Sequence, residues 1–141
     1  MFVRIISYLH GKLRSKMLEN KTEPTKSELE ILQVLWEYGP SNVRFVNNKL
    51  NEKTRTVQYT STLKLMQIMY SKGMLKRDDT NMTHIYSPAE AEQKTKNYLL
   101  EKFVNSMFNG SASNLMMQLL GNKKTSKKEL KLIKDMLDKI E

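Results

Sequence analysis

The chain has 141 residues, which is enough for one ordinary domain or for a small domain with an assembly element, and too few for two full hydrophobic cores. It carries 24 Lys and Arg against 15 Asp and Glu, a formal charge of +9, so a polyanion is its natural partner. The absence of cysteine excludes a disulfide framework and a thiolate metal site, and the two histidines, His10 and His84, have no ligand-spaced partners. We therefore expect neither a metal nor a cofactor.

Residues 1–23 precede the first predicted helix. The first sixteen residues are apolar at the start and basic afterwards, and Arg4 interrupts the apolar run, which argues against a secretory signal. Two interpretations stay open. One is a membrane-surface helix with Phe2 and Ile5 on its apolar side, and the other is a leader ahead of a usual start at Met17. We favour the second and treat residues 1–23 as a leader or flexible extension.

Two short helices are predicted next. Thr25 and Glu28 fit the first and fourth positions of a capping box, which starts a helix that Gly39-Pro40 closes. Ser41 or Asn42 caps a second helix, whose apolar residues recur at helical spacing while its polar residues face elsewhere. A polar connection then leads into the stretch around which the rest of the chain is organised.

The stretch from Thr56 to Gly73 is predicted to form a recognition helix. One side is apolar at helical spacing, and the other carries amides, hydroxyls and an ammonium, which suit phosphate oxygens and base edges. Residues 44–77 hold eight basic side chains against Glu52 alone, which favours nucleic acid. The expected groove contacts are Thr60, Ser61 and Lys64, with Gln58, Tyr59 and Gln67 at the margin. The expected phosphate and wing contacts are Arg44, Arg55, Lys72, Lys76 and Arg77.

Two alternating runs after Gly73 predict a β-hairpin. They are Met74–Arg77 and Thr83–Tyr86, and the polar segment Asp78–Met82 lies between them. Helices followed by a hairpin form the outline of a winged helix-turn-helix, which we assign to residues 24–88. The predicted fold is therefore mainly α with a small β-hairpin wing.

Residues 89–141 are predicted to form a helical dimerisation domain. Ser87–Glu90 fits a capping box for a long helix, Ser113 or Asn114 starts a short apolar helix, and Ser126–Glu129 caps an amphipathic last helix. These helices are too short and too apolar to stand alone, so they pack on the winged helix or on a second copy, and we favour a homodimer. The expected interface residues are Leu99, Phe103, Met107, Leu115, Leu119, Leu130, Ile133, Leu137 and Ile140.

The order and spacing of these segments resemble the BlaI/MecI/CopY family of bacterial repressors. The resemblance runs from Pro24 to Glu141 and rests on Thr25–Trp36, Gly39-Pro40, Val43–Val46, Tyr59–Met66, Lys72-Gly73, Tyr86–Pro88 and Phe108–Ser111. It implies an N-terminal winged helix and a C-terminal region of three helices that dimerises on dyad-symmetric operators. It also implies release through a membrane-bound sensor metalloprotease, with cleavage near Gln118-Leu119. The copper-responsive branch, which uses a cysteine cluster, is excluded.

The sequence departs from the family pattern at three places. Val57 stands where a Trp is often found, Ile68 replaces a basic residue, and Asn81-Met82 replaces Gly-Arg at the wing tip. Base reading is therefore expected to differ from that of relatives, and the wing is expected to contribute less.

The expectation as a whole is a cytoplasmic, homodimeric, sequence-specific repressor that binds an operator in double-stranded DNA. The alternative is a winged helix that binds a protein. An enzyme is set aside because the sequence shows no paired carboxylates in a plausible pocket, no glycine-rich phosphate loop and no nucleophile with a base.

Overall fold

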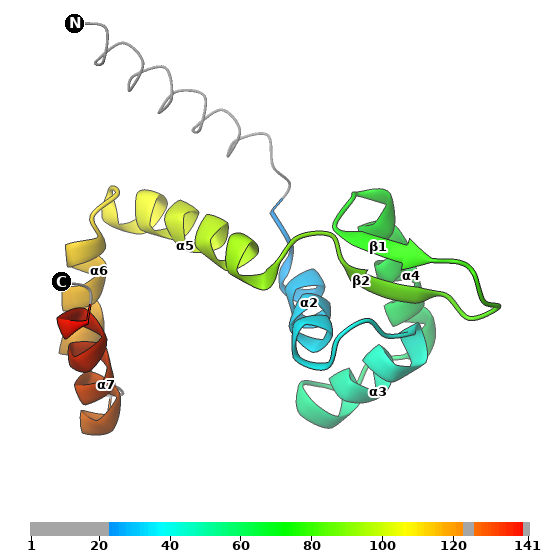
Figure 1. The fold of residues 1–141 in the computed structure, drawn as a ribbon, viewed down its shortest axis with the longest axis horizontal. Coiled ribbons are helices and arrows are strands. Elements are labelled where there is room, and N and C mark those ends of the chain that lie inside the picture. The colour runs from blue at the N-terminus through cyan, green and yellow to red at the C-terminus, as the bar shows by residue number, and fades with distance from the viewer. Residues whose placement is uncertain (1–22, 123–125, 140–141) are drawn as a thin grey trace, which may run out of the picture. The chain divides into compact units, whose positions relative to one another are not determined.

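The computed structural model describes residues 23–122 and 126–139 and is mainly helical with one hairpin (Figure 1). The elements follow the order α2 (Lys26–Tyr38), α3 (Val43–Lys53), α4 (Tyr59–Ser71), β1 (Leu75–Asp78), β2 (Ile85–Pro88), α5 (Glu92–Phe108), α6 (Ala112–Gly121) and α7 (Lys127–Asp138). The predicted fold class is confirmed. The interpretations of residues 1–16 and the interface assignment of Ile140 lie outside the described residues.

The chain divides into two compact units, one ending at Tyr98 and the other beginning at Leu99. The first unit holds the three helices α2, α3 and α4 and the hairpin, which contact one another around one apolar core. Ile31 and Leu35 of α2, Val46 of α3 and Met66 of α4 are almost completely buried in that core. Full burial of each such side chain stabilises the fold by roughly 1.5–3 kcal/mol, so the amphipathic pattern of these helices determines how they pack.

Both strands of the hairpin are attached to the helices, β1 to α4 and β2 to α2. β1 and β2 pair antiparallel, and Leu75 and Tyr86 are buried in the core. Beyond the hairpin, Ser41 N–H donates to the carbonyl of Tyr86 at 3.0 Å, and Tyr86 N–H donates back to the Ser41 carbonyl at 2.9 Å. The segment that joins α2 to α3 therefore pairs with the wing, as a short third strand would.

Local capping signals identify the starts of three helices. The Thr25 hydroxyl accepts from Glu28 N–H at 3.2 Å, and Thr25 N–H donates to the Glu28 carboxylate at 2.9 Å, which confirms the first capping box. Of the two candidate caps for α3, Asn42 is the cap, because its side chain accepts from Phe45 N–H at 2.8 Å. The capping box of Ser126 and Glu129 is confirmed at α7.

Two predicted helix starts and both predicted strands need correction. Ser87 is not a helix cap, because it pairs with Lys76 in the hairpin, and α5 begins only at Glu92. Ser111, and not Ser113 or Asn114, caps α6 by accepting from Asn114 N–H at 3.2 Å. The strands begin later than Met74 and Thr83, since Leu75 faces Pro88 in the observed register.

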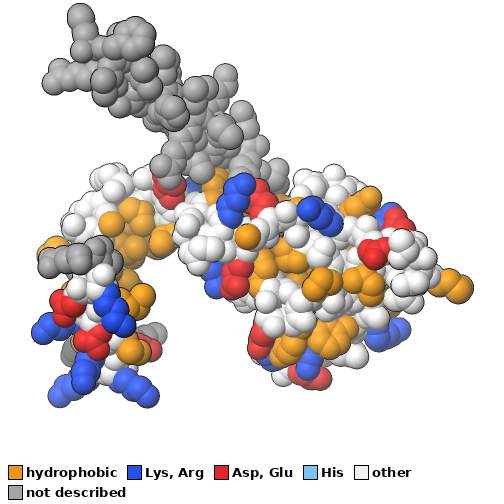
Figure 2. All heavy atoms as spheres, in the orientation of Figure 1, with side chains coloured by type: hydrophobic (Ala, Val, Ile, Leu, Met, Phe, Trp, Pro, Cys, Tyr) orange, Lys and Arg blue, Asp and Glu red, His pale blue; other side chains and the backbone are white. Residues whose placement is uncertain are grey.

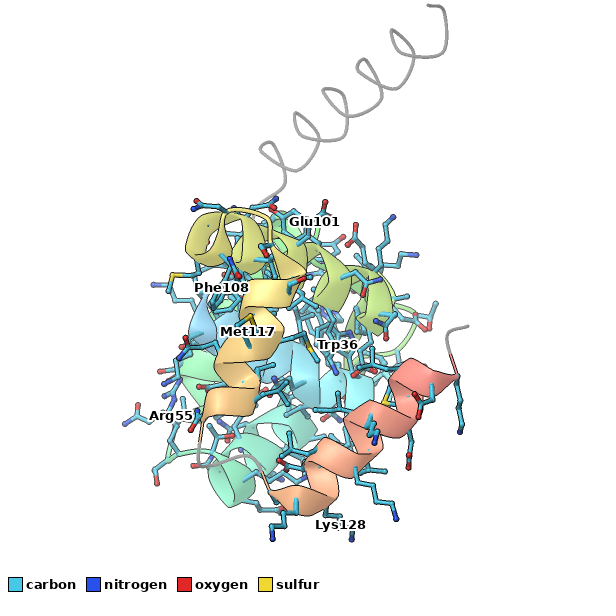
Figure 3. The ribbon with its side chains drawn as sticks, turned by 90° about the vertical axis from the view of Figure 1, so that its left-hand side faces the viewer. Trp36, Arg55, Glu101, Phe108, Met117 and Lys128 are labelled. Carbon is cyan, nitrogen blue, oxygen red and sulfur yellow. The ribbon has the colours of Figure 1, made fainter. Side chains whose placement is uncertain are left out.

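The second unit leaves much of its apolar surface exposed. Val104 of α5 is buried, and the rings of Phe103 and Phe108 lie edge to face with centroids 5.9 Å apart. In contrast, Met107 is 66% exposed and Met117, labelled on α6 in Figure 3, is 70% exposed. On the C-terminal helices, hydrophobic side chains lie beside charged ones (Figure 2).

Candidate nucleic-acid interface

The helix α4 has one buried and one exposed side, as its sequence predicts. Thr62, Met66 and Met69 are buried against the rest of the first unit. Of the side chains expected to contact DNA from this helix, Tyr59 is half-buried. The others are exposed: Gln58, Thr60, Ser61, Lys64 and Gln67. The helix is shorter than the predicted stretch, because Thr56 and Val57 lie in the preceding turn and Gln58 is the N-cap.

A stacked pair of side chains lies at the start of α4. The guanidinium of Arg44, from α3, is 4.0 Å from the centroid of the Tyr59 ring. This cation–π contact orients an arginine next to the first turn of α4 without using its hydrogen-bond donors. The structure thus brings a predicted phosphate contact and a predicted groove-margin residue together.

Three of the predicted DNA-contacting cations have no acidic partner among the described residues. Arg44, Lys64 and Lys76 are exposed, and no ion pair joins any of them to a carboxylate in that part of the chain. Their charge is therefore available to an external anion.

Lys72 is paired with a buried acid of its own chain. Its ammonium lies 3.1 Å from the Glu28 carboxylate, which is only 1% exposed. Burial raises the pKa of Glu28, but the Thr25 N–H and the Lys72 ammonium together outweigh it, so the pKa lies below its ordinary value. This pair joins the end of α4 to the start of α2, a tie that sequence spacing does not reveal.

Arg55 is held in a similar way, on the turn between α3 and α4. Its Nε lies 3.4 Å from Glu30 Oε2, and its Nη2 donates to the Ser27 hydroxyl at 3.2 Å. The side chain is still half exposed, so it remains within reach of solvent. Lys72 and Arg55 therefore each hold an internal carboxylate, which the sequence did not predict.

The wing carries an internally neutralised arginine. The Asp79 carboxylate accepts from Arg77 Nε at 2.7 Å and from Nη2 at 3.3 Å, and the guanidinium lies 4.2 Å from the Tyr70 ring centroid. The bond to Asp79 raises the pKa of Arg77. At the tip, Met82 is fully exposed. The one wing arginine of the predicted DNA contacts therefore already has an acidic partner within the hairpin segment.

A hollow of about 500 Å³ lies beside the exposed side of α4. Its lining includes three predicted contact residues, Arg55, Ser61 and Lys64, together with the buried residues Ile31 and Leu50. Residues far apart in sequence therefore converge on one surface with two cations.

The sequence interpretation missed two asparagines of α3. Asn47, which the periodicity placed on the polar side of α3, is buried. Asn47 and Asn51 each donate a hydrogen bond to the Val57 carbonyl, in the turn before α4. The sequence did contain a signal for these bonds. Asparagine is unfavourable inside helices, so two asparagines four residues apart indicate that their side chains make hydrogen bonds outside the helix.

The described residues show neither a cluster of three metal-ligating side chains nor a helix long and apolar enough to cross a membrane.

A family model described as "Penicillinase repressor" matches residues 24–139. The chain belongs to the penicillinase repressor family. Members of this family are transcriptional regulators and not enzymes, so the chain is a DNA-binding repressor.

Two penicillinase repressors are similar to this family member at low sequence identity. The Bacillus licheniformis penicillinase repressor is 23% identical over 112 residues, covering 79% of this chain and 87% of the relative. The Staphylococcus aureus penicillinase repressor is 20% identical over 124 residues, covering 88% and 98%. A MarR family protein from Bacillus stearothermophilus shares the fold, with a TM-score of 0.52, 17% identity and coverage of 99% of this chain and 89% of that one.

Proposed function

We propose that this penicillinase repressor family member is a homodimer that binds a dyad-symmetric operator through α4 and thereby blocks transcription. The observation that carries the proposal is the exposed side of α4, where Thr60, Ser61 and Lys64 stand opposite a buried side. Exposed hydroxyl and ammonium groups on a helix backed by a core can enter a major groove without disturbing the fold.

The proposed roles divide according to the partners of each side chain. Thr60, Ser61 and Lys64 contact base edges, with Gln58, Tyr59 and Gln67 at the margin of the groove. Arg44 and Lys76, which hold no acid in the described chain, contact phosphates directly. Arg55, Lys72 and Arg77 each have an internal carboxylate, so a phosphate has to share or displace that partner. We expect their contribution to affinity to be smaller.

Dimerisation is supported by the apolar surface of the second unit. Phe103, Met107, Leu119 and Leu137 are at least 42% exposed in the single chain. Leu99, Leu115, Leu130 and Ile133, from the same predicted set, are half-buried. Burial of apolar surface contributes roughly 25 cal/mol per Å², so a second copy that covers these side chains removes a large cost of exposure. Symmetric pairing would also give two copies of α4 about 34 Å, or a multiple of that distance, apart.

Release by proteolysis is the finer part of the proposal. Gln118 and Leu119 lie inside α6, so the bond between them must leave the helix before a protease can bind it in extended form. We propose that a membrane-bound sensor metalloprotease brings about this cut in the cytoplasm, which weakens the dimer. Each freed winged helix then has half of the DNA contacts. Induction that leaves every chain intact would rule out this route.

The test is capture of fragments from the source genome by the purified full-length protein, followed by sequencing. We expect dyad-symmetric sites, with affinity that falls steeply as salt is added. Sedimentation of the same preparation should give a dimer. Affinity for duplex DNA that is independent of both sequence and salt would contradict the proposal and would favour the protein-binding alternative.

A further inference from the structure

Asn51 bonds both main-chain groups of Val57, the residue just before the N-cap of α4. Its Nδ2 donates to the Val57 carbonyl at 3.0 Å, and its Oδ1 accepts from Val57 N–H at 3.0 Å. One side-chain amide therefore fixes both main-chain polar groups of a single residue, which belong to two successive peptide units of the turn, as a neighbouring strand would. Asn51 itself lies in the last part of α3.

Asn47, one helical turn earlier, extends this network into α4. Its Nδ2 donates to the Val57 carbonyl at 3.0 Å and to the Thr62 hydroxyl at 2.9 Å. Asn47 is 6% exposed and Thr62 is 1% exposed, so these bonds are shielded from water. The two side-chain amides are also joined to each other, because Asn51 Nδ2 donates to Asn47 Oδ1 at 3.3 Å, and the same Nδ2 donates to the main-chain carbonyl of Asn47 at 2.7 Å.

The start of α4 lacks the local cap that fixes the starts of α2 and α3. Thr25 and Asn42 accept from their own first turns, whereas Gln58, at the N-cap of α4, makes no such side-chain bond. The first turn of α4 contains Thr60 and Ser61, which we expect to read bases. The bonds from α3 do not cap α4, since they reach Val57 and the Thr62 hydroxyl, but they fix the position of its start, where accurate placement has the greatest effect on reading.

We propose that Asn47 and Asn51 are positioning residues, which together we name the turn clamp, and that they set the start of α4 before DNA binds. The clamp rests on the proposed function, because its purpose is to hold the reading side chains in register. It need not touch DNA. If the first turn of α4 is already ordered, binding does not have to pay the conformational entropy of ordering it. This gain in affinity applies to a matched site, where base contacts form, and not to random duplex, where phosphate contacts dominate.

The test compares Asn51→Ala with Asn48→Ala as a matched control. Both residues are exposed on α3, so neither change leaves a cavity, and Asn48 makes no side-chain bond recorded among the described residues. Asn51→Ala is expected to lower affinity for genomic fragments captured by the wild type about tenfold, while affinity for random-sequence duplex stays within about twofold. Asn48→Ala should change neither.

A second variant keeps part of the clamp. Asn51→Asp retains the acceptor for Val57 N–H, but it places a carboxylate oxygen where Nδ2 faces the Val57 and Asn47 carbonyls, so the ratio of specific to random affinity should fall at least as far as in Asn51→Ala. An added charge weakens binding to both duplexes alike, so the ratio isolates positioning from electrostatics.

Hydrogen exchange at the Val57 amide gives an independent readout. Protection in the wild type and its loss in Asn51→Ala, in a protein that still melts cooperatively, would support the clamp. An unchanged affinity ratio, or an amide that stays protected in Asn51→Ala, would overturn it. A wild type that prefers no genomic fragment would instead refute the proposed function, and Val57 exchange would still show whether Asn51 holds the turn.

Discussion

Lys72, the C-cap residue of α4, holds the buried carboxylate of Glu28 in the first turn of α2, with Nζ and Oε2 3.1 Å apart. The same carboxylate accepts from Thr25 N–H. One acid therefore caps α2 and anchors the far end of α4, which gives Lys72 a structural role in addition to any contact with DNA.

Glu28→Gln should lower the free energy of unfolding at pH 7 by roughly 1–3 kcal/mol, because a charged hydrogen bond to Lys72 is replaced by a neutral one. Urea denaturation measures the change. Glu52→Gln is the control, since Glu52 pairs with Lys49 on the surface and should contribute at most about 1 kcal/mol. Equal effects of the two substitutions would contradict a special role for the buried acid.

The stability of the first unit should also depend on pH through Glu28. The pKa of Glu28 is lowered in the folded protein, so its contribution is complete above its unfolded pKa, about 4.3, and is lost as the pH falls through the folded pKa. Wild-type stability should therefore fall more steeply below about pH 4.3 than that of Glu28→Gln. Parallel profiles for the two proteins would refute this prediction.

Lys64→Ala should weaken binding to captured genomic fragments by roughly 1–3 kcal/mol if Lys64 reads a base. Titration of matched and scrambled duplexes measures the loss. Equal losses on both would restrict Lys64 to phosphate contact.

Lys72→Ala, at the other end of the helix, should instead act mainly on the free energy of unfolding, since its ammonium already has a partner.

Asp79→Asn should raise affinity for DNA by about twofold to fivefold at low salt, because it removes a negative charge and releases the Arg77 guanidinium. Asp78→Asn is the matched control. Asp78 accepts from Thr80 N–H and from the Thr80 hydroxyl, so its loss removes the same charge without releasing Arg77. The same gain from both variants would show that net charge alone is responsible.

Leu137→Lys should shift the protein from dimer to monomer, because a charged side chain cannot be buried unpaired in an apolar interface. Sedimentation across a concentration series measures the shift. Asp138→Lys, on the neighbouring position of α7, introduces the same side chain and should leave the dimer largely intact if the interface lies on the apolar side of α7. Equal dissociation by both variants would contradict this interface.

Features encoded within one or two helical turns were predictable from sequence. The capping boxes at Thr25 and Ser126 and the two sides of α4 depend on spacings of three and four residues, which periodicity and capping chemistry describe. Ser87 misled the interpretation because a serine before a proline suits a helix start, whereas strand pairing with Lys76 takes precedence.

The features that were missed depend on tertiary contact. Lys72 and Glu28 are 44 positions apart, and Asn47 and Val57 are 10 positions apart. No local pattern links such residues, and a surface lysine in a basic stretch has the same spacing whether it meets a phosphate or a buried acid. The composition therefore predicted a basic surface, but not which of its cations are already occupied.

The reciprocal main-chain bonds between Ser41 and Tyr86 determine how the wing can move. They join the hairpin to the α2–α3 connection at a point where both segments also contact the core. An independent swing of the hairpin would have to break this pairing. The wing and the three helices should therefore meet a duplex as one rigid body. The angle at which α4 enters a groove then also sets the distance from Met82 to the adjacent DNA backbone.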